Sequence, residues 1–337
     1  MAVEVDSGVE HLVTDYLVVG AGAMGLGFLD ELITSSTKME AIIVDTRQAP
    51  GGHWNDAYDF VRLDQPAITY GVNSRSLGSG NPCYLASKEE ILEHFALVLE
   101  ALVATGRVKW FPQCRFTGDG CFQSELDPKV KYSVMVRRKL VDATLTSPCI
   151  PATTKPNYEV AEGVNFIPVN GLAKLEKSWD RYMVIGAGKT ALDAILFMLE
   201  RGVQSDQICW VVSNSCWYLC REPFLKDKGG HFVKELFQSV LEDSVTNPEA
   251  CLLDMEKRGL MMRLDKKTLP TKFRAATLSD GEMTAVGRVK DLVRMGRIKR
   301  IEEKRVIFQT NQVKLQPALI KQKTCAGNPN KREDIAH

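Results

Sequence analysis

The fold is decided by the stretch Tyr16-Leu17-Val18-Val19-Gly20-Ala21-Gly22-Ala23-Met24-Gly25. A short apolar run, a glycine-rich turn and then a helical pattern of apolar residues through Ile33 predict a strand, a tight turn and a helix. Gly20 permits the turn, Gly22 lets the backbone approach a pyrophosphate, and Gly25 lets the helix pack closely on the strand. The helix N-terminus then presents unpaired amides to phosphates. The stretch therefore predicts a dinucleotide-binding βαβ unit.

An acidic residue extends this motif. The apolar strand predicted at 41–44 ends in Asp45, about twenty residues after Gly25, where a carboxylate can accept hydrogen bonds from a ribose hydroxyl. A turn that binds nothing, and an Asp45 that only ends a strand, remain alternatives. Arg47 could contact an adenine or a phosphate, or be a solvated charge. The candidate residues of this first site are Gly20, Gly22, Ala23, Met24, Gly25, Asp45, Thr46 and Arg47.

A second unit repeats the pattern. The apolar residues 182–185 precede Gly186-Ala187-Gly188-Lys189-Thr190-Ala191, and a helix is predicted at 192–200. Ala191 can replace the third glycine because close packing requires only a small side chain there. The strand predicted at 208–212 ends in Ser213, whose hydroxyl tolerates a 2′-phosphate better than a carboxylate would. We therefore expect NADPH rather than NADH at this second site.

Arg221 is a candidate clamp for the 2′-phosphate, with an ordinary surface arginine as the alternative. The second site is thus predicted to contain Gly186, Gly188, Lys189, Thr190, Ser213 and Arg221. No acid–base pair or nucleophile stands out in the chain, so no catalytic residue is assigned.

Composition limits the class of protein. A chain of 337 residues with 45% hydrophobic content is long enough for two domains. The 43 basic and 42 acidic residues nearly cancel, so we expect neither nucleic acid nor an anionic membrane as a partner. Nine scattered cysteines suggest reduced thiols, a cytoplasmic location and no metal site. No apolar stretch is long enough to span a membrane, and residues 1–14 are expected to be a disordered tail.

The two units together resemble the two-dinucleotide-binding flavoproteins, and more narrowly the flavin-containing monooxygenase-like group, over roughly residues 15–318. The resemblance implies FAD at the first site and NADPH at the second. It also implies that Gly51, Gly52, His53 and Trp54 pass beside the flavin. Independently, paired glycines allow close backbone approach to a flat ligand, and an aromatic residue offers a stacking face. A histidine satisfied by protein contacts is the alternative for His53.

The resemblance also sets the expected architecture, an α/β fold with two Rossmann-like dinucleotide-binding domains and the NAD(P)H domain inserted in the FAD domain. The strand predicted at 139–144, followed by prolines, resembles the strand that closes the first FAD segment. The expected bounds are a disordered tail at 1–14, an FAD domain at 15–150, an NAD(P)H domain at 151–303, returning strands of the FAD domain at 304–318 and a disordered tail at 319–337.

Local signals complete this first domain. Ser87-Lys88-Glu89-Glu90 is a capping box that predicts a helix to about Ala104. The stretches 108–116 and 130–136 are predicted to be strands of a small covering sheet.

Two departures from the monooxygenase group bear on activity. Its Phe-x-Gly-x-x-x-His linker is not found, because Phe116-Thr117-Gly118 is followed by Phe122 at the histidine position. The polar stretch 321–337 takes the place of a closing strand and helix of the FAD domain, which would make the chain a shortened form. Cys216 and Cys220 lack the C-x-x-C spacing of a thiol-redox site.

We therefore expect an FAD-dependent oxidoreductase that takes hydride from NADPH and is monooxygenase-like toward a small organic substrate, with molecular oxygen as co-substrate. An NAD(P)H dehydrogenase or oxidase without oxygen insertion, and a shortened, inactive nucleotide-binding protein, are the alternatives. The oligomeric state stays open, a homo-oligomer included.

Overall fold

The structure is a computed structural model, and it describes residues 8–310 apart from 79, 82, 146–151, 153, 177, 226–229 and 244–246. The chain divides into two compact units. The first comprises Met1–Lys155, Tyr218–Met262 and Ala275–Asp280, and the second comprises Pro156–Trp217, Arg263–Arg274 and Gly281–His337.

The first unit is built on a six-stranded sheet. Its strand order is β5 (Val108–Phe111), β2 (Ala41–Val44), β1 (Val9–Val19), β8 (Lys131–Asp142), β7 (Cys121–Ser124) and β6 (Cys114–Gly118). The β5, β2, β1 and β8 strands are mutually parallel, whereas β7 pairs antiparallel with both β8 and β6. The parallel part of the sheet aligns the carboxyl ends of its strands, where nucleotide sites form.

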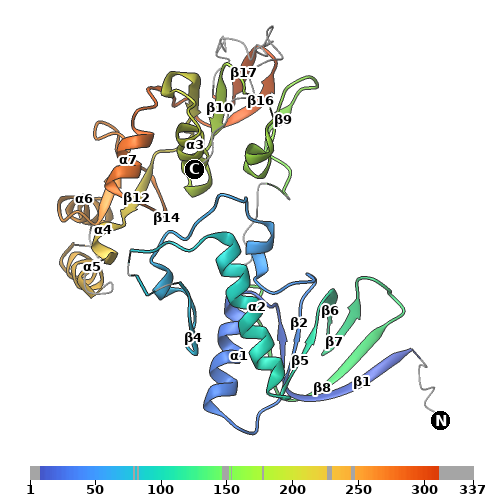
Figure 1. The fold of residues 1–337 in the computed structure, drawn as a ribbon. Helices are drawn as coiled ribbons and strands as arrows, with labels where there is room; N and C mark the ends of the chain where they lie inside the picture. Colours follow the sequence, from blue (N-terminus) through green and yellow to red (C-terminus); the bar gives the residue numbers. More distant parts are fainter. Residues whose placement is uncertain are drawn as a thin grey trace, which may run out of the picture. The chain divides into compact units, whose positions relative to one another are not determined.

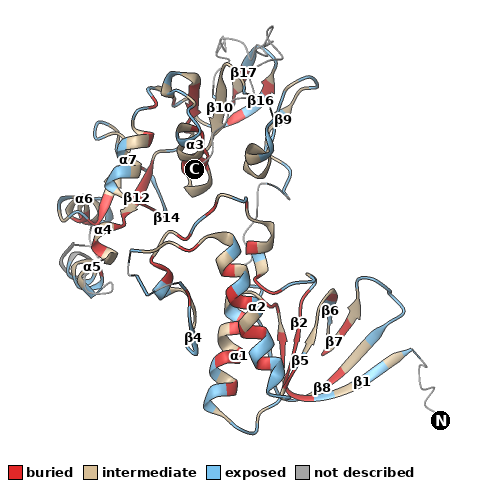
Figure 2. Ribbon diagram, viewed as in Figure 1, coloured by how far each residue is buried: buried red, intermediate tan, exposed pale blue. Residues whose placement is uncertain are grey.

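Two helices cover one face of this sheet (Figure 1). They are α1 (Ala23–Ser35) and α2 (Lys88–Ala104), which contact each other. The α1 helix buries Leu26, Leu29 and Ile33, and Figure 2 shows buried residues along both helices. The predicted capping box is confirmed, because Ser87 and Glu90 exchange side-chain-to-amide hydrogen bonds of 3.4 Å and 2.9 Å.

A separate apolar cluster joins strands from both ends of the sheet. Leu17 and Ile42 on the parallel strands share it with Cys114, Phe122 and Val134. Phe122 also stacks on Tyr132, with ring centroids 4.6 Å apart. The β6–β7 hairpin is therefore packed into the core of the first unit through large apolar side chains.

Three strand expectations need correction. The expected tail at 1–14 is ordered from Val9, because β1 pairs with β8 from Val9 onward and Thr14 is buried. Residues 1–7 lie outside the described residues. The β5 strand belongs to the main sheet and not to a covering sheet, since it pairs parallel with β2. The strands expected at 130–136 and 139–144 form one strand, β8, whose pairing with β1 shifts register at Thr14/Tyr16.

Short elements follow the sheet strands of the first unit. These are η1 (Gly52–Asp56), η2 (Ala67–Thr69), the hairpin of β3 (Gly71–Val72) and β4 (Arg75–Ser76), and the helices α4 (Glu222–Leu225), α5 (Gly230–Asp243) and α6 (Pro248–Lys257). A three-stranded sheet has the order β13 (Met261–Arg263), β12 (Cys216–Cys220) and β14 (Lys272–Leu278). It is followed by helix α7 (Asp280–Val286).

The second unit contains its own parallel sheet of β10 (Tyr182–Ile185), β11 (Ile208–Val211) and β15 (Asp291–Val293). Helix α3 (Lys189–Glu200) connects β10 to the short η4 (Ser205–Gln207) that precedes β11. A further sheet has the order β17 (Arg305–Phe308), β16 (Ile298–Glu302) and β9 (Glu159–Val160), and η3 (Val169–Lys174) precedes β10.

Returning strands of the first sheet are expected at 304–318, but β17, the part of that range that the structure describes as a strand, does not pair with the first sheet. It forms a hairpin with β16, and its Val306 and Phe308 are buried in a cluster with Val211 and Val293 of the second unit. Burial of these two side chains is the physical reason for the hairpin, since it removes them from water without a long connection. Residues 311–337 lie outside the described residues. Within the described part of the chain, no helix is long and apolar enough to cross a membrane.

Candidate dinucleotide sites

The first glycine turn lies between β1 and α1, and two of its glycines are required by the protein itself. Gly20 has a φ of 102°, a conformation that side chains disfavour. A Cβ atom on Gly25 would lie 2.0 Å from the Gly20 carbonyl oxygen. The turn is also tied to the next segment, because the Gly51 amide donates to the Ala21 carbonyl over 2.8 Å.

Gly22 differs from these two glycines. It is the N-cap of α1, with an ordinary φ of −85°. A Cβ atom there would meet its nearest neighbour, the Gly52 Cα, at 3.5 Å, which is normal van der Waals contact. Neither backbone conformation nor packing therefore demands glycine at this position. The close approach of a ligand to the helix N-terminus would give a reason for glycine at position 22.

Asp45 follows β2 and is buried. Its Oδ2 accepts a hydrogen bond of 2.7 Å from the Ala21 amide, and its Oδ1 accepts one of 2.8 Å from the Arg47 amide. The carboxylate thus lies against the glycine turn and does more than end a strand.

Arg47 is ion-paired within the same region. Its Nη2 and Nε lie 2.5 Å and 3.1 Å from Asp56 Oδ2, and its Nη1 lies 3.9 Å from Asp45 Oδ1. Of the remaining predicted contacts, Thr46 is exposed. On the first turn of α1, Met24 is exposed and Ala23 is half-buried.

The Gly51–Trp54 run forms the start of η1 beside the first turn. Gly51 and Gly52 have φ values of 111° and 56°. Trp54 is buried, and its Nε1 donates to the Tyr70 hydroxyl over 2.8 Å. The His53 ring stacks on Trp54 with centroids 5.4 Å apart. His53 is exposed. Desolvation, and then the charge of Arg47, lower its pKa, so the ring is neutral near pH 7.

The second glycine turn lies between β10 and α3. Gly186 has a φ of 118°, and its carbonyl accepts a 2.6 Å hydrogen bond from Trp210 Nε1. Gly188 is the N-cap of α3 with a φ of −89°. A Cβ atom on Gly188 would meet nothing within 4 Å. Gly188 therefore repeats the observation at Gly22, with open space in place of a neighbour.

The residues after Gly188 are held by the helix itself. Lys189 pairs with Asp193 one turn later, with Nζ 2.6 Å from Oδ2, and Thr190 is half-buried. Ser213 lies just beyond β11 and is half-buried. The residue before it, Val212, donates its amide to the Val293 carbonyl over 2.9 Å.

Arg221 belongs to the first unit and is buried. Its Nε donates to the Asp64 carbonyl over 2.9 Å, and its Nη2 donates to the Thr277 carbonyl over 3.3 Å. The surface-arginine alternative is therefore wrong. A role for Arg221 at a 2′-phosphate stays a prediction. Its guanidinium already donates hydrogen bonds to two main-chain carbonyls.

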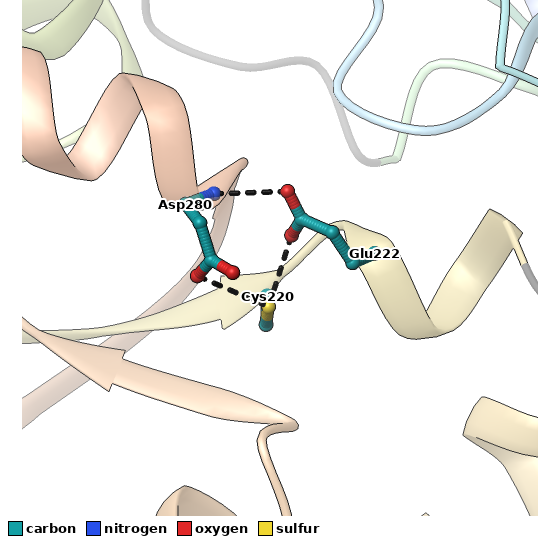
Figure 3. Close-up of side chains that lie close together, drawn as sticks. All are labelled: Cys220, Glu222 and Asp280. Atoms are coloured by element: carbon teal, nitrogen blue, oxygen red, sulfur yellow. Dashed lines mark hydrogen bonds between the residues drawn. The ribbon is translucent and has the colours of Figure 1, made fainter.

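Cys220 lies in a small cluster with two carboxylates (Figure 3). Its Sγ donates to Glu222 Oε2 over 3.1 Å and lies 4.0 Å from Asp280 Oδ1, while the Asp280 amide donates to Glu222 Oε1 over 2.9 Å. Burial and the hydrogen bond to Glu222 raise the pKa of Cys220 to about 12. Burial also raises the pKa of Cys216. Both thiols are thus protonated near pH 7.

Three residues near the first site were not singled out from the sequence. They are Ala21, whose amide binds Asp45; Asp56, which pairs with Arg47; and Tyr70, which bonds to Trp54. Asp56 had a usable signal, because it is an acid nine residues after an arginine and shortly after the paired glycines. Tyr70 had no comparable signal.

Comparison with known sequences finds uncharacterized relatives. An uncharacterized protein of Mycobacterium tuberculosis (strain H37Rv) and one of Mycobacterium bovis are each 37% identical over 322 residues, which is 91% of this chain. The chain spans 59% of the length of these relatives. No protein-family model matches the chain.

Comparison with solved structures identifies the fold. A steroid monooxygenase bound to NADP matches with a TM-score of 0.52 and 14% identity, over 90% of this chain and 70% of that one. A cyclohexanone monooxygenase in a closed form gives the same TM-score and identity over 91% and 70%. The cyclohexanone monooxygenase of Rhodococcus sp. Phi1 bound to NADP+ gives 0.50 and 14% over 91% and 70%. The predicted α/β fold class is confirmed, and the chain shares the fold of these monooxygenases.

Proposed function

We propose that the chain is an FAD- and NADPH-dependent oxidoreductase of the monooxygenase type, which acts on a small organic substrate together with molecular oxygen. The single observation that carries the proposal is the pair of glycine turns, each at the carboxyl end of a parallel strand and each opening a helix. The fold shared with two monooxygenases described as bound to NADP or NADP+ adds support.

The N-cap glycines fit the proposed cofactors. Gly22 and Gly188 both have ordinary backbone angles and room for a Cβ atom, so protein packing does not account for the missing side chain. A pyrophosphate that approaches the helix N-terminus does account for it, because its oxygens need the space and the amides. We assign FAD to the turn at Gly22, next to Asp45 and the Gly51–Trp54 run, and NADPH to the turn at Gly188.

Each residue then has a defined task. Asp45 would accept a hydrogen bond from the adenosine ribose, and the Gly51-Gly52 backbone would pass close to the flavin. Ser213 would face the 2′-phosphate of NADPH without repelling it. FAD, when bound, would supply the redox chemistry with NADPH as the hydride donor, and the protein would contribute binding and orientation. The location that we expect remains cytoplasmic, and a homo-oligomer remains open.

One observation favours an oxidase or dehydrogenase without oxygen insertion as the second candidate. The sequence that comes nearest to the monooxygenase linker, Phe116-Thr117-Gly118, lies in the β6–β7 hairpin, where Phe116 pairs with Phe122. It is therefore part of the first sheet and not a connection between units.

The test is a flavin-retention and reduction experiment. The purified chain is mixed with FAD, desalted and examined by visible absorption, and NADPH is then added without oxygen. We expect a retained flavin band that bleaches. A matched Gly22→Asn variant should lose the flavin while remaining folded, because asparagine is a favoured N-cap. No retained flavin in the unmodified chain would contradict the proposal, and peroxide formed in step with NADPH loss under air would favour the oxidase.

A further inference from the structure

Asp45 joins two segments of the first site through one carboxylate. Its two oxygens each accept a main-chain amide, from Ala21 in the glycine turn and from Arg47 in the loop after β2. Charge-assisted bonds to main-chain amides are among the stronger hydrogen bonds in proteins. The backbone of Arg47 is therefore set at a defined place relative to the glycine turn.

The Arg47 side chain is in turn set by Asp56. Its Nε and Nη2 both donate to Asp56 Oδ2, at 3.1 Å and 2.5 Å. The side chains of Arg47 and Asp56 are 37% and 32% exposed, and an ion pair as accessible as this contributes little to stability. A contribution to stability therefore gives little reason for the pair. Its two hydrogen bonds to one oxygen do fix the orientation of the Arg47 guanidinium.

The orientation of the Arg47 guanidinium matters because the ion pair lies beside the first glycine turn. The acid after the second strand of a dinucleotide fold receives the adenosine ribose, and Arg47 is two residues beyond that acid. A guanidinium can stack on adenine or bond to a phosphate. Asp56 ends η1, the segment that begins at Gly52, so the pair fastens the adenosine side of the site to the Gly51–Trp54 run.

We propose that Asp56 is a positioning residue, which holds the Arg47 guanidinium against the adenosine half of the dinucleotide bound at the first glycine turn. The inference rests on the proposed function and extends it, since it assigns Arg47 as a contact to adenosine diphosphate and not to the flavin ring. Without Asp56, the arginine side chain samples other rotamers, and binding must order it again at an entropic cost.

The test measures binding of FAD by flavin fluorescence and of ADP by its displacement of FAD. We expect Asp56→Asn and Arg47→Met each to weaken both ligands by about 5- to 10-fold, with no further loss in the double variant because the two residues act as one unit. The control is Asp59→Asn, which removes a neighbouring carboxylate that lies 3.3 Å from Lys88 Nζ. It should leave both affinities unchanged.

The outcomes separate this inference from the function on which it rests. If the unmodified chain binds neither FAD nor ADP, the proposed function fails. If it binds both and the Asp56→Asn chain binds them equally well, the positioning role is wrong. A loss of FAD affinity without a loss of ADP affinity also overturns the inference, because the pair would then act through the flavin half.

Discussion

Gly25 and Gly20 approach so closely that a Cβ atom on Gly25 would lie 2.0 Å from the Gly20 carbonyl oxygen. This contact couples the first turn of α1 to the end of β1, and no side chain can be accommodated without a backbone shift.

Gly25→Ala should therefore destabilise the chain by about 1–3 kcal/mol, the usual cost of an overpacked site. The measurement is the free energy of unfolding in urea. Gly27→Ala is the matched control, because a Cβ atom on Gly27, in the same helix, meets nothing within 4 Å. It should be neutral or stabilising by up to about 1 kcal/mol, since alanine is the better helix former. Equal destabilisation by both substitutions would mean that the close approach to Gly20 is not what requires glycine at position 25.

Gly188→Asn should separate binding from folding at the second site. Asparagine is a favoured N-cap residue, and the position has an ordinary φ with open space around it. We expect an unchanged free energy of unfolding and a loss of NADPH affinity on the order of 10-fold, because the side chain occupies the pyrophosphate position. Titration by protein fluorescence measures the affinity. Unchanged NADPH binding would move the cofactor away from this turn.

Asp45→Ala should affect both stability and binding. The substitution leaves the Ala21 amide without its side-chain acceptor, which costs about 1–3 kcal/mol for a buried donor. It also removes the ribose acceptor, so FAD retention after desalting should fall. Asp45→Asn keeps one carbonyl oxygen for the Ala21 amide but places its NH2 group against the Arg47 amide, so it should recover part of the stability. A stable Asp45→Ala chain that retains FAD would mean that the carboxylate has neither role.

The features that could be predicted from the sequence are those encoded locally. Both glycine turns and the capping box at Ser87 are defined by residues a few positions apart, so short-range periodicity and turn chemistry are enough. Long-range features could not be predicted in this way. The Arg221 contact joins residues 157 positions apart, and its burial depends on how that segment packs.

The β8 strand shows a different limit. Arg137 and Arg138 interrupt its apolar pattern, which favours two short strands. In the structure both arginines lie near Asp15, at 3.0 Å and 3.9 Å, and the strand continues through them. Pairing with β1 over the whole length outweighs the local pattern, as is common for strands, whose preferences depend on their neighbours.

Ser213→Asp should test the preference for NADPH. A carboxylate at this position would repel a 2′-phosphate and could bond to a free 2′-hydroxyl. We expect NADPH affinity to fall by about 10-fold or more, which corresponds to about 1.4 kcal/mol of binding free energy, while NADH affinity is kept or improved. Titration with each nucleotide measures both affinities. Equal effects on the two nucleotides would place the 2′-phosphate elsewhere.

His94 predicts how the stability of the first unit depends on pH. The residue is on α2 and only 4% exposed, and within the described part of the chain its Nε2 has no hydrogen-bond partner. A Cβ atom on Gly71 would lie 2.6 Å from that nitrogen, so the β3–β4 hairpin lies directly against the ring. Desolvation, and then the charge of Arg75, lower the His94 pKa, while Asp30 opposes them.

Because the folded pKa is lower than the unfolded one, the unfolded chain binds the proton more readily. The free energy of unfolding should therefore decrease as pH falls through about 6.5, the ordinary histidine value, until the folded state is also protonated. His94→Leu should reduce this decrease, measured by urea unfolding between pH 7.5 and about 5.5. Part of the decrease should remain in the His94→Leu chain, because the pKa of His53 is also lowered. An unchanged pH dependence in the His94→Leu chain would show that the buried ring is not the group that titrates.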